Sequence, residues 1–105
     1  MNRGEIWWAA FDESSGHDAD GARPCVILSP DDMIGELKTV IVAPLASRGR
    51  PASFRPAVKF DGVDGVLLLD HVRALDTTRL MRPSGKLSDK TLDQALGALR
   101  AMFAA

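Results

Sequence analysis

The hydrophobic positions of the chain fall into short runs separated by glycine, proline and polar residues, a pattern typical of a compact β domain. The run at 5–11 (EIWWAAF) predicts a first strand, and 23–29 (RPCVILS) predicts a second, with Pro24 tolerated near its start. The β-branched run at 38–45 (KTVIVAPL) predicts a buried third strand. Between the second and third strands, 31–34 (DDMI) is expected to form a single helical turn.

The middle of the chain gives a weaker strand pattern. Residues 54–60 (FRPAVKF) alternate imperfectly, and Pro56 favours an edge strand or a bulged one. A turn at 61–65 (DGVDG) leads into 66–75 (VLLLDHVRAL), which predicts a strand or a pair of strands. Asp70 interrupts this apolar run, and an acid there is unfavourable unless it is exposed or paired.

Near its C-terminus the chain changes to a helical period. Four hydrophobic residues at i, i+4, i+7 and i+11 form one stripe: Leu92, Leu96, Leu99 and Phe103. Ser88 is the expected N-cap, and Asp89 suits the positive end of the helix dipole. Gly97 weakens the helix by up to about 1 kcal/mol relative to alanine, which indicates either close packing or tolerance. The fold class expected is mainly β, a small SH3-like barrel covered at one end by a C-terminal helix.

Length and composition limit the classes of protein to which the chain can belong. With 105 residues the chain is expected to form a single domain, 1–105. One cysteine, Cys25 in an apolar run, excludes an intramolecular disulfide and favours a buried, inert thiol. No stretch is long and apolar enough to span a membrane, and the N-terminal residues lack signal-peptide architecture, so we expect a cytoplasmic protein.

Charge is unevenly distributed, although the net charge is only −1. Residues 37–60 carry five basic side chains and no acid: Lys38, Arg48, Arg50, Arg55 and Lys59. Such a stripe binds phosphates in some proteins and is a solvated loop in others. Composition alone leaves both readings open.

The loop SSGHDADGARPCVILS (14–29) places His17 and acids before Arg23 at the start of a strand. No metal-ligand spacing, phosphate-binding glycine loop or nucleophile-elbow serine is present, so we expect no metal and no cofactor. Arginine beside an acid–base pair suits RNA cleavage by the 2′-hydroxyl of the RNA itself. That reaction needs a base, an acid and a fixed cation where charge develops on phosphorus. The candidates are Arg23, His17 and Asp70, with His71 and Arg73 more typical of surface or dimer contacts.

The segment RGEIWWAAFDESSGHDADGARPCVILSPDDM resembles the start of the MazF/PemK/Kid family of toxin–antitoxin ribonucleases. The resemblance continues through TVIVAPLAS, LDHVRALD, GKLSD and the final helix. It implies a homodimer of SH3-like, CcdB-type barrels that cleaves single-stranded RNA without a metal and leaves a 2′,3′-cyclic phosphate. It also implies a cognate antitoxin, similar to MazE or PemI, whose acidic tail covers the RNA site.

The resemblance also implies roles for particular residues. Arg23 matches the family arginine that stabilises the phosphate and assists proton transfer, and His17 and Asp70 match the acid–base residues of the Kid-like branch. Several family positions differ here: Asp18-Ala19 replaces a Glu-Gln pair, Asp12-Glu13 replaces Asp-Pro, and two further differences concern the phosphate-binding site. Ala46 stands where a threonine hydroxyl usually contacts the phosphate, with Ser47 as the substitute candidate, and Leu68 replaces an arginine.

Other residues have expected supporting roles, and two alternative functions remain open. Arg48, Arg50 and Arg55 are expected to hold RNA by charge. Trp7 and Trp8 point to opposite faces of a strand, so one is core and the other lies at a dimer interface or on a base-stacking surface. Two alternatives to a ribonuclease remain: a CcdB-like gyrase poison, disfavoured because the chain ends MFAA, and a degenerate member that binds RNA or antitoxin without cleavage.

Overall fold

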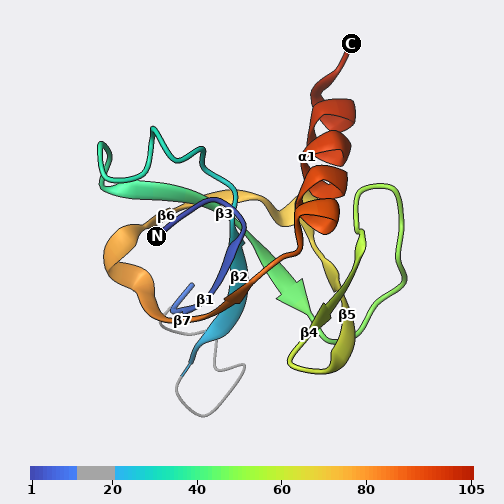
Figure 1. Ribbon diagram of the computed structural model, residues 1–105, viewed down its shortest axis with the longest axis horizontal. Coiled ribbons are helices and arrows are strands. Elements are labelled where there is room, and N and C mark those ends of the chain that lie inside the picture. Colours follow the sequence, from blue (N-terminus) through green and yellow to red (C-terminus); the bar gives the residue numbers. More distant parts are fainter. Residues whose placement is uncertain (12–20) are drawn as a thin grey trace.

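The computed structural model describes residues 1–11 and 21–105. The described chain is organised around seven β-strands, and an α-helix follows them near the C-terminus (Figure 1). The strands are β1 (Glu5–Ala9), β2 (Arg23–Ile27), β3 (Thr39–Ala46), β4 (Ala57–Phe60), β5 (Val63–Leu67), β6 (Arg73–Asp76) and β7 (Leu80–Lys86). Two 3₁₀ turns, η1 (Leu69–His71) and η2 (Thr77–Arg79), flank β6, and the helix is α1 (Asp89–Phe103).

All the strand pairs are antiparallel, and β3 takes part in two sheets. Its first half pairs with β6, residues 42–44 pair with β2, and the sheet continues from β2 through β1 to β7. At its far end Leu45 pairs with Leu67 and Ala46 with Val66, so β5 and its partner β4 form a second wing. The five strands β6, β3, β2, β1 and β7 curl into the SH3-like arrangement expected from the sequence, with the second wing beside them (Figure 1).

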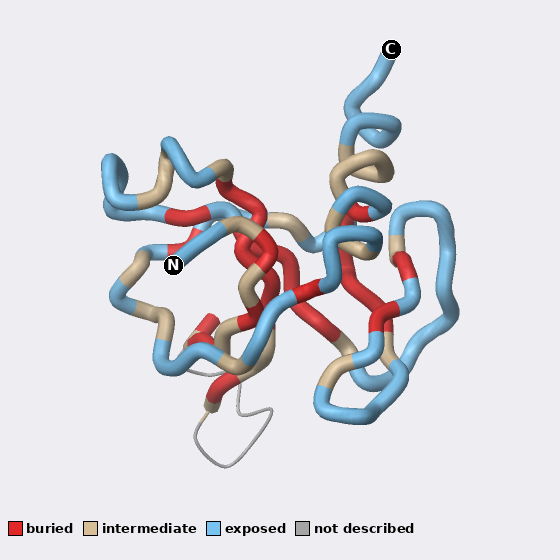
Figure 2. Tube along the Cα trace, viewed as in Figure 1, coloured by how far each residue is buried: buried red, intermediate tan, exposed pale blue. Residues whose placement is uncertain are grey.

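Two hydrophobic clusters hold these layers together. The inner cluster lies on one face of the curled strands and includes Cys25, Ile27, Val40 and Val42, all at most 2% exposed. The outer cluster lies against α1 and contains Leu67 and Leu69, which are fully buried. In Figure 2 the buried stretches run through the central strands, and the far end of α1 is exposed.

The predicted helix is confirmed, with one correction. Ser88 caps it, since its hydroxyl accepts a hydrogen bond from the Thr91 N–H at 3.1 Å. Leu92, Leu96 and Leu99 pack against the outer cluster. Phe103 was expected to continue the stripe, but it is 76% exposed because the helix extends past the sheet that covers its earlier turns.

The strand predictions hold apart from one omission and one shifted boundary: the turn expected over 61–65 is shorter, because β5 begins at Val63. Strand β4 begins directly after Pro56 and lies at the sheet edge, as that proline indicates. The run at 66–75 is a strand pair, broken by η1 where Asp70 stands. Residues 31–34 form a hydrogen-bonded turn, with the Met33 N–H donating to the Pro30 carbonyl. Strand β7 was not predicted.

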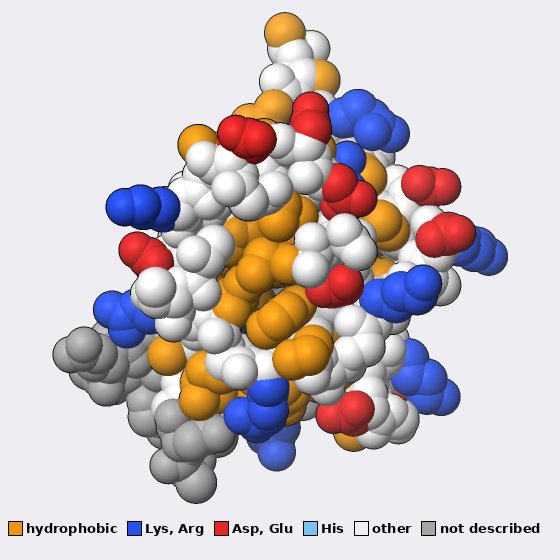
Figure 3. All heavy atoms as spheres, turned by 60° about the vertical axis from the view of Figure 1, so that its left-hand side comes forward, with side chains coloured by type: hydrophobic (Ala, Val, Ile, Leu, Met, Phe, Trp, Pro, Cys, Tyr) orange, Lys and Arg blue, Asp and Glu red, His pale blue; other side chains and the backbone are white. Residues whose placement is uncertain are grey.

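Part of the surface remains apolar. Exposed large hydrophobic residues include Leu37, Ile41 and Met81. Figure 3, in which the side of the molecule carrying β6 is turned forward, shows hydrophobic side chains gathered in the middle of one face with charged groups around them. Within the described ranges, no helix is both long and apolar enough to cross a membrane.

Candidate nucleic-acid site

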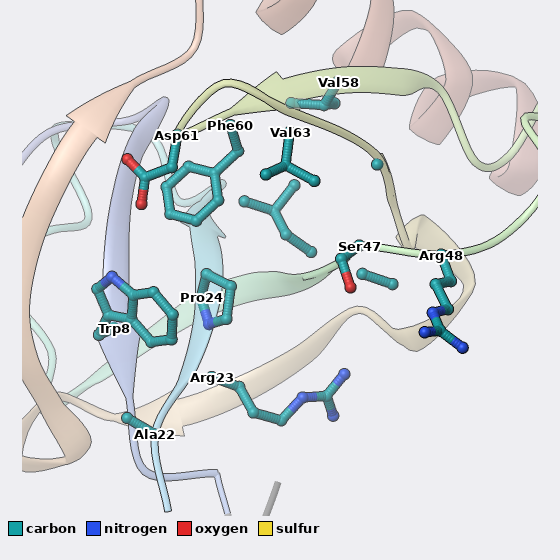
Figure 4. Close-up of a pocket in the computed structure, with 13 residues that line it drawn as sticks. Trp8, Ala22, Arg23, Pro24, Ser47, Arg48, Val58, Phe60, Asp61 and Val63 are labelled. Carbon is teal, nitrogen blue, oxygen red and sulfur yellow. The ribbon is translucent and has the colours of Figure 1, made fainter. Parts of the chain in front are cut away.

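A cavity of about 550 Å³ lies where the two wings of the sheet diverge. Its polar side is formed by Arg23 at the start of β2 and by Ser47 and Arg48 directly after β3 (Figure 4). Its apolar floor and far wall include Trp8 and Phe60. We refer to this space as the central cavity. Its volume is in the range of ligand-binding pockets, roughly 300–1,000 Å³.

Local structure holds Arg23 at this position. Its guanidinium carbon lies 5.6 Å from the centre of the Phe11 ring, and the guanidinium carbon of Arg73 lies at the same distance from that ring. Arginine stacked on an aromatic face gains a cation–π interaction and loses side-chain freedom. Two permanent positive charges therefore meet at one ring beside the cavity, an arrangement suited to binding phosphate oxygens.

The adjacent tryptophans of β1 occupy different surroundings, as strand geometry requires. Trp7 packs against the inner cluster, and its indole N–H donates to the Glu5 carboxylate at 2.9 Å. Trp8 lines the central cavity, with its ring centre 6.1 Å from that of Phe60. Trp8 thus fits the base-stacking alternative left open by the sequence, since aromatic faces stack on nucleobases.

Asp70 lies in a separate cluster on η1 and does not line the central cavity. Arg55 donates two hydrogen bonds to its carboxylate, from Nε at 2.9 Å and from Nη2 at 2.7 Å. His71 Nε2 lies 3.7 Å from the same carboxylate. Hydrogen bonding to Arg55 lowers the pKa of Asp70 and raises that of Arg55. Asp70 is therefore a carboxylate at neutral pH, and its proton affinity is reduced.

The remaining candidate residues differ in whether the structure describes them and in whether they lie near the cavity. His17 lies outside the described residues. Arg50 lies exposed in the segment after β3, and no interaction of its side chain is seen within the described chain. Leu68, at the family arginine position, is buried in the core at 6% exposure, so the cation beside Asp70 comes from Arg55 in the loop instead. Ala46 ends β3 and Ser47, exposed, follows it at the cavity.

The Cys25 thiol is not available to react at this site. The thiol is fully buried in the inner cluster, and burial raises its pKa to about 12 despite the opposing charge of Arg23. The expectation of a buried, inert thiol is confirmed.

The cavity wall includes residues that the sequence did not identify as site residues, among them Phe60, Asp61 and Val63. Phe60 and Val63 flank the tight turn of the β4–β5 hairpin and Asp61 lies in it, and the sequence pattern indicated this segment only as a turn. An acid in a DG turn is the usual composition of such hairpins, so no local signal separated Asp61 from an ordinary turn residue.

Comparison with known proteins gives a family match over nearly the whole chain. Residues 2–103 match the family described as PemK-like, MazF-like toxin of type II toxin–antitoxin system. The chain is 33% identical to endoribonuclease PemK of Escherichia coli, over 94% of this chain and 79% of that protein. It is 35% identical to the endoribonuclease toxin ChpB of Escherichia coli strain K12, over 97% and 93%.

Solved structures agree in fold. The chain aligns with MazF in a MazE–MazF crystal structure from Deinococcus radiodurans with a TM-score of 0.80 and 26% identity, covering 99% of this chain and 95% of that one. A crystal structure of MazF from the same organism aligns with a TM-score of 0.79 and 29% identity, over 97% and 94%.

Proposed function

Because the chain belongs to the PemK-like, MazF-like family of toxins of type II toxin–antitoxin systems, we propose that it is an endoribonuclease that cleaves single-stranded RNA without a metal ion. The observation that carries the proposal is the central cavity, where Arg23, Ser47 and Arg48 face one another beside an aromatic wall. The arginine side chains and the Ser47 hydroxyl can bind a phosphodiester there while Trp8 contacts an adjacent base.

The reaction joins the 2′-oxygen of the RNA to phosphorus as the bond from phosphorus to the 5′-oxygen breaks, leaving a 2′,3′-cyclic phosphate. Charge develops on the non-bridging oxygens, and a fixed guanidinium stabilises it. Arg23 is suited to this role because its charge persists at all physiological pH values and its planar fork matches two phosphate oxygens. The Ser47 hydroxyl supplies the hydrogen bond that Ala46 lacks.

We assign the proton transfers to Asp70 and His17. Because Asp70 lies on η1 outside the central cavity, this assignment requires the bound RNA to extend from Arg23 to η1. Asp70 is ionised at neutral pH, the state that a general base requires. Its pairing with Arg55 reduces its basicity, so RNA that draws Arg55 onto a phosphate would also return proton affinity to the carboxylate. His17 takes the complementary role at the leaving oxygen.

Loop arginines and a second protein chain complete the proposal. Arg48, Arg50 and Arg55 hold the RNA backbone by charge. The apolar patch seen in Figure 3 supports a homodimer, since contiguous apolar surface marks interfaces. An antitoxin with an acidic tail is the expected inhibitor, by analogy with the MazE–MazF complex, and both partners would act in the cytoplasm.

The test is cleavage of a long single-stranded RNA by purified protein in EDTA, with both fragment ends mapped. We expect cuts at a short recurrent sequence with cyclic-phosphate ends. Arg23→Ala should lower the cleavage rate about 10²–10³-fold, as loss of a transition-state donor does. Arg100→Ala, which removes an exposed arginine on α1, is the matched control and should cleave normally.

Intact RNA from folded protein free of antitoxin would contradict the enzymatic proposal. The missing hydroxyl at Ala46 favours one alternative in that case, a family member that binds RNA or antitoxin without cutting. Retained RNA binding with no cleavage would identify it.

A further inference from the structure

The wall of the central cavity opposite Arg48 carries a negative charge. It is formed by Trp8, Phe60 and Asp61, and in Figure 4 Asp61 and Arg48 stand at opposite ends of the cavity. Trp8 is half-buried, tilted 50° from the Phe60 ring, and covered by the Arg82 guanidinium 5.1 Å from its ring centre. Arg82 does not line the cavity, so the wall presents an aromatic surface and one carboxylate to the cavity, at the end away from Arg48.

The backbone fixes Asp61 at this wall. Asp61 and Gly62 have φ values of 52° and 74°, and the flanking pair Phe60–Val63 closes the β4–β5 hairpin around them. Two consecutive left-handed residues are the signature of a type I′ turn, which accepts Asp, Asn and Gly. Within the described chain no hydrogen bond or ion pair engages the Asp61 carboxylate. A positioned acceptor is thus free at the cavity edge.

We propose that this wall is a base-recognition pocket that selects guanine, with Asp61 as the specificity-determining residue. The proposal rests on the proposed function and adds to it the base that the site reads. The base lies against Trp8 and Phe60, and the Asp61 carboxylate accepts hydrogen bonds from its edge. The sugar–phosphate of the same nucleotide extends toward Arg23.

Hydrogen-bond chemistry selects the base. A carboxylate offers only acceptors, and guanine presents two adjacent donors, N1–H and the N2 amine, which match its two oxygens. Adenine and cytosine place a ring-nitrogen acceptor beside their amine, and uracil places its N3–H between two carbonyl oxygens. Each of these puts a lone pair against the carboxylate, so guanine alone makes the bidentate contact.

The charge distribution fits the same orientation. A carboxylate close to a bound phosphate would repel it, and Asp61 lies at the far end of the cavity from Arg48. The base end thus favours neutral N–H donors, and the arginine end favours anionic oxygens. One nucleotide in one orientation satisfies both.

The test measures binding of uncleavable single-stranded hexamers, with 2′-O-methyl groups throughout, by tryptophan fluorescence. A uridine background carries one central guanine, inosine or adenine. We expect guanine to bind about 10- to 100-fold more tightly than adenine. Inosine, which keeps N1–H but lacks the N2 amine, should fall between them.

Two matched variants assign the effect to one carboxylate. Asp61→Asn keeps a residue that tolerates positive φ and should abolish the guanine preference while leaving the circular dichroism spectrum unchanged. Asp64→Asn removes an exposed acid of the same hairpin that does not line the cavity, and should keep the preference. Equal affinity for the three hexamers in the unmodified protein, no binding of any of them, or a preference that survives Asp61→Asn would overturn the proposal.

Sequencing the cut ends of a randomised RNA separates this proposal from the ribonuclease proposal. Cleavage without guanine enrichment, together with indifferent hexamer binding, rejects guanine recognition and leaves the ribonuclease. Guanine-selective binding that Asp61→Asn abolishes, in a protein that cuts no RNA, supports the pocket and rejects the nuclease.

Discussion

Gly65 on β5 allows a close approach between the backbones of β5 and the end of β3, beside the central cavity. A Cβ added there would lie 3.2 Å from the Ala46 carbonyl carbon, still closer to its oxygen, and 3.4 Å from the Ser47 Cα. These neighbours are backbone atoms, which cannot rotate away as a side chain would. Gly65→Ala must therefore separate β3 from β5 at the point where Ser47 enters the cavity.

The size of the effect follows from this geometry. Overpacking against a fixed neighbour destabilises proteins by about 1–3 kcal/mol. Each kcal/mol shifts the Tm of a domain of this size by roughly 4–8 °C, so Gly65→Ala should lower Tm by roughly 5–20 °C. Displacement of Ser47 should also slow cleavage at least about tenfold at temperatures where the variant is folded, since small misplacements of catalytic groups reduce rates strongly.

Gly97→Ala in α1 is the matched control. A Cβ at this position would meet only the Arg100 guanidinium, at an ordinary 3.7 Å, so the structure resolves the question of Gly97 in favour of tolerance. The substitution should stabilise the protein by about 0.4–1 kcal/mol. Urea unfolding followed by circular dichroism measures both variants. A Gly65→Ala protein as stable as the unmodified chain would show that the wings are not packed as described.

Two further predictions concern titratable groups. Because Arg55 lowers the pKa of Asp70, Asp70→Asn should reduce the free energy of unfolding at neutral pH. The stability difference between the two proteins should shrink as pH falls below the ordinary aspartate pKa near 3.9. Urea midpoints from pH 7 to pH 2.5 test this, and a stability difference that grows on acidification would contradict the ion pair. The Cys25 thiol, with its pKa raised to about 12, should resist Ellman's reagent at pH 8 until urea unfolds the protein, whereas rapid reaction of the native protein would show that the inner cluster is open.

Hydrophobic pattern predicted the elements whose burial is regular and missed the one whose burial is not. Strands β2 and β3 are nearly continuous apolar runs and were found. Strand β7 contains Pro83 and Gly85 and is mostly exposed, so it has no alternation, and it forms because β1 offers it an unpaired edge. Phe103 fits the helical period, yet a period does not reveal where the underlying sheet ends.

From the sequence, only the site residues that belong to recognisable motifs could be predicted. Arg23 was indicated by its chemistry and by the family resemblance, Ser47 by the resemblance alone, and both line the cavity. The contact between Arg55 and Asp70 joins residues 15 positions apart through side chains, and no local pattern encodes it. Asp61 resembles any turn residue until the hairpin is placed against Trp8, because its surroundings are created by tertiary structure.

The sharing of β3 between two sheets has a consequence for how such a molecule can diverge. Arg23 belongs to the curled five-stranded part, and Asp61 belongs to the hairpin on the other side of β3. Substitutions in the hairpin turn change one wall of the cavity and leave the pairing of β2 untouched. Under the proposed roles, base selection and bond breaking depend on separate segments, so a new base preference can arise from a few changes in the hairpin turn without altering β2.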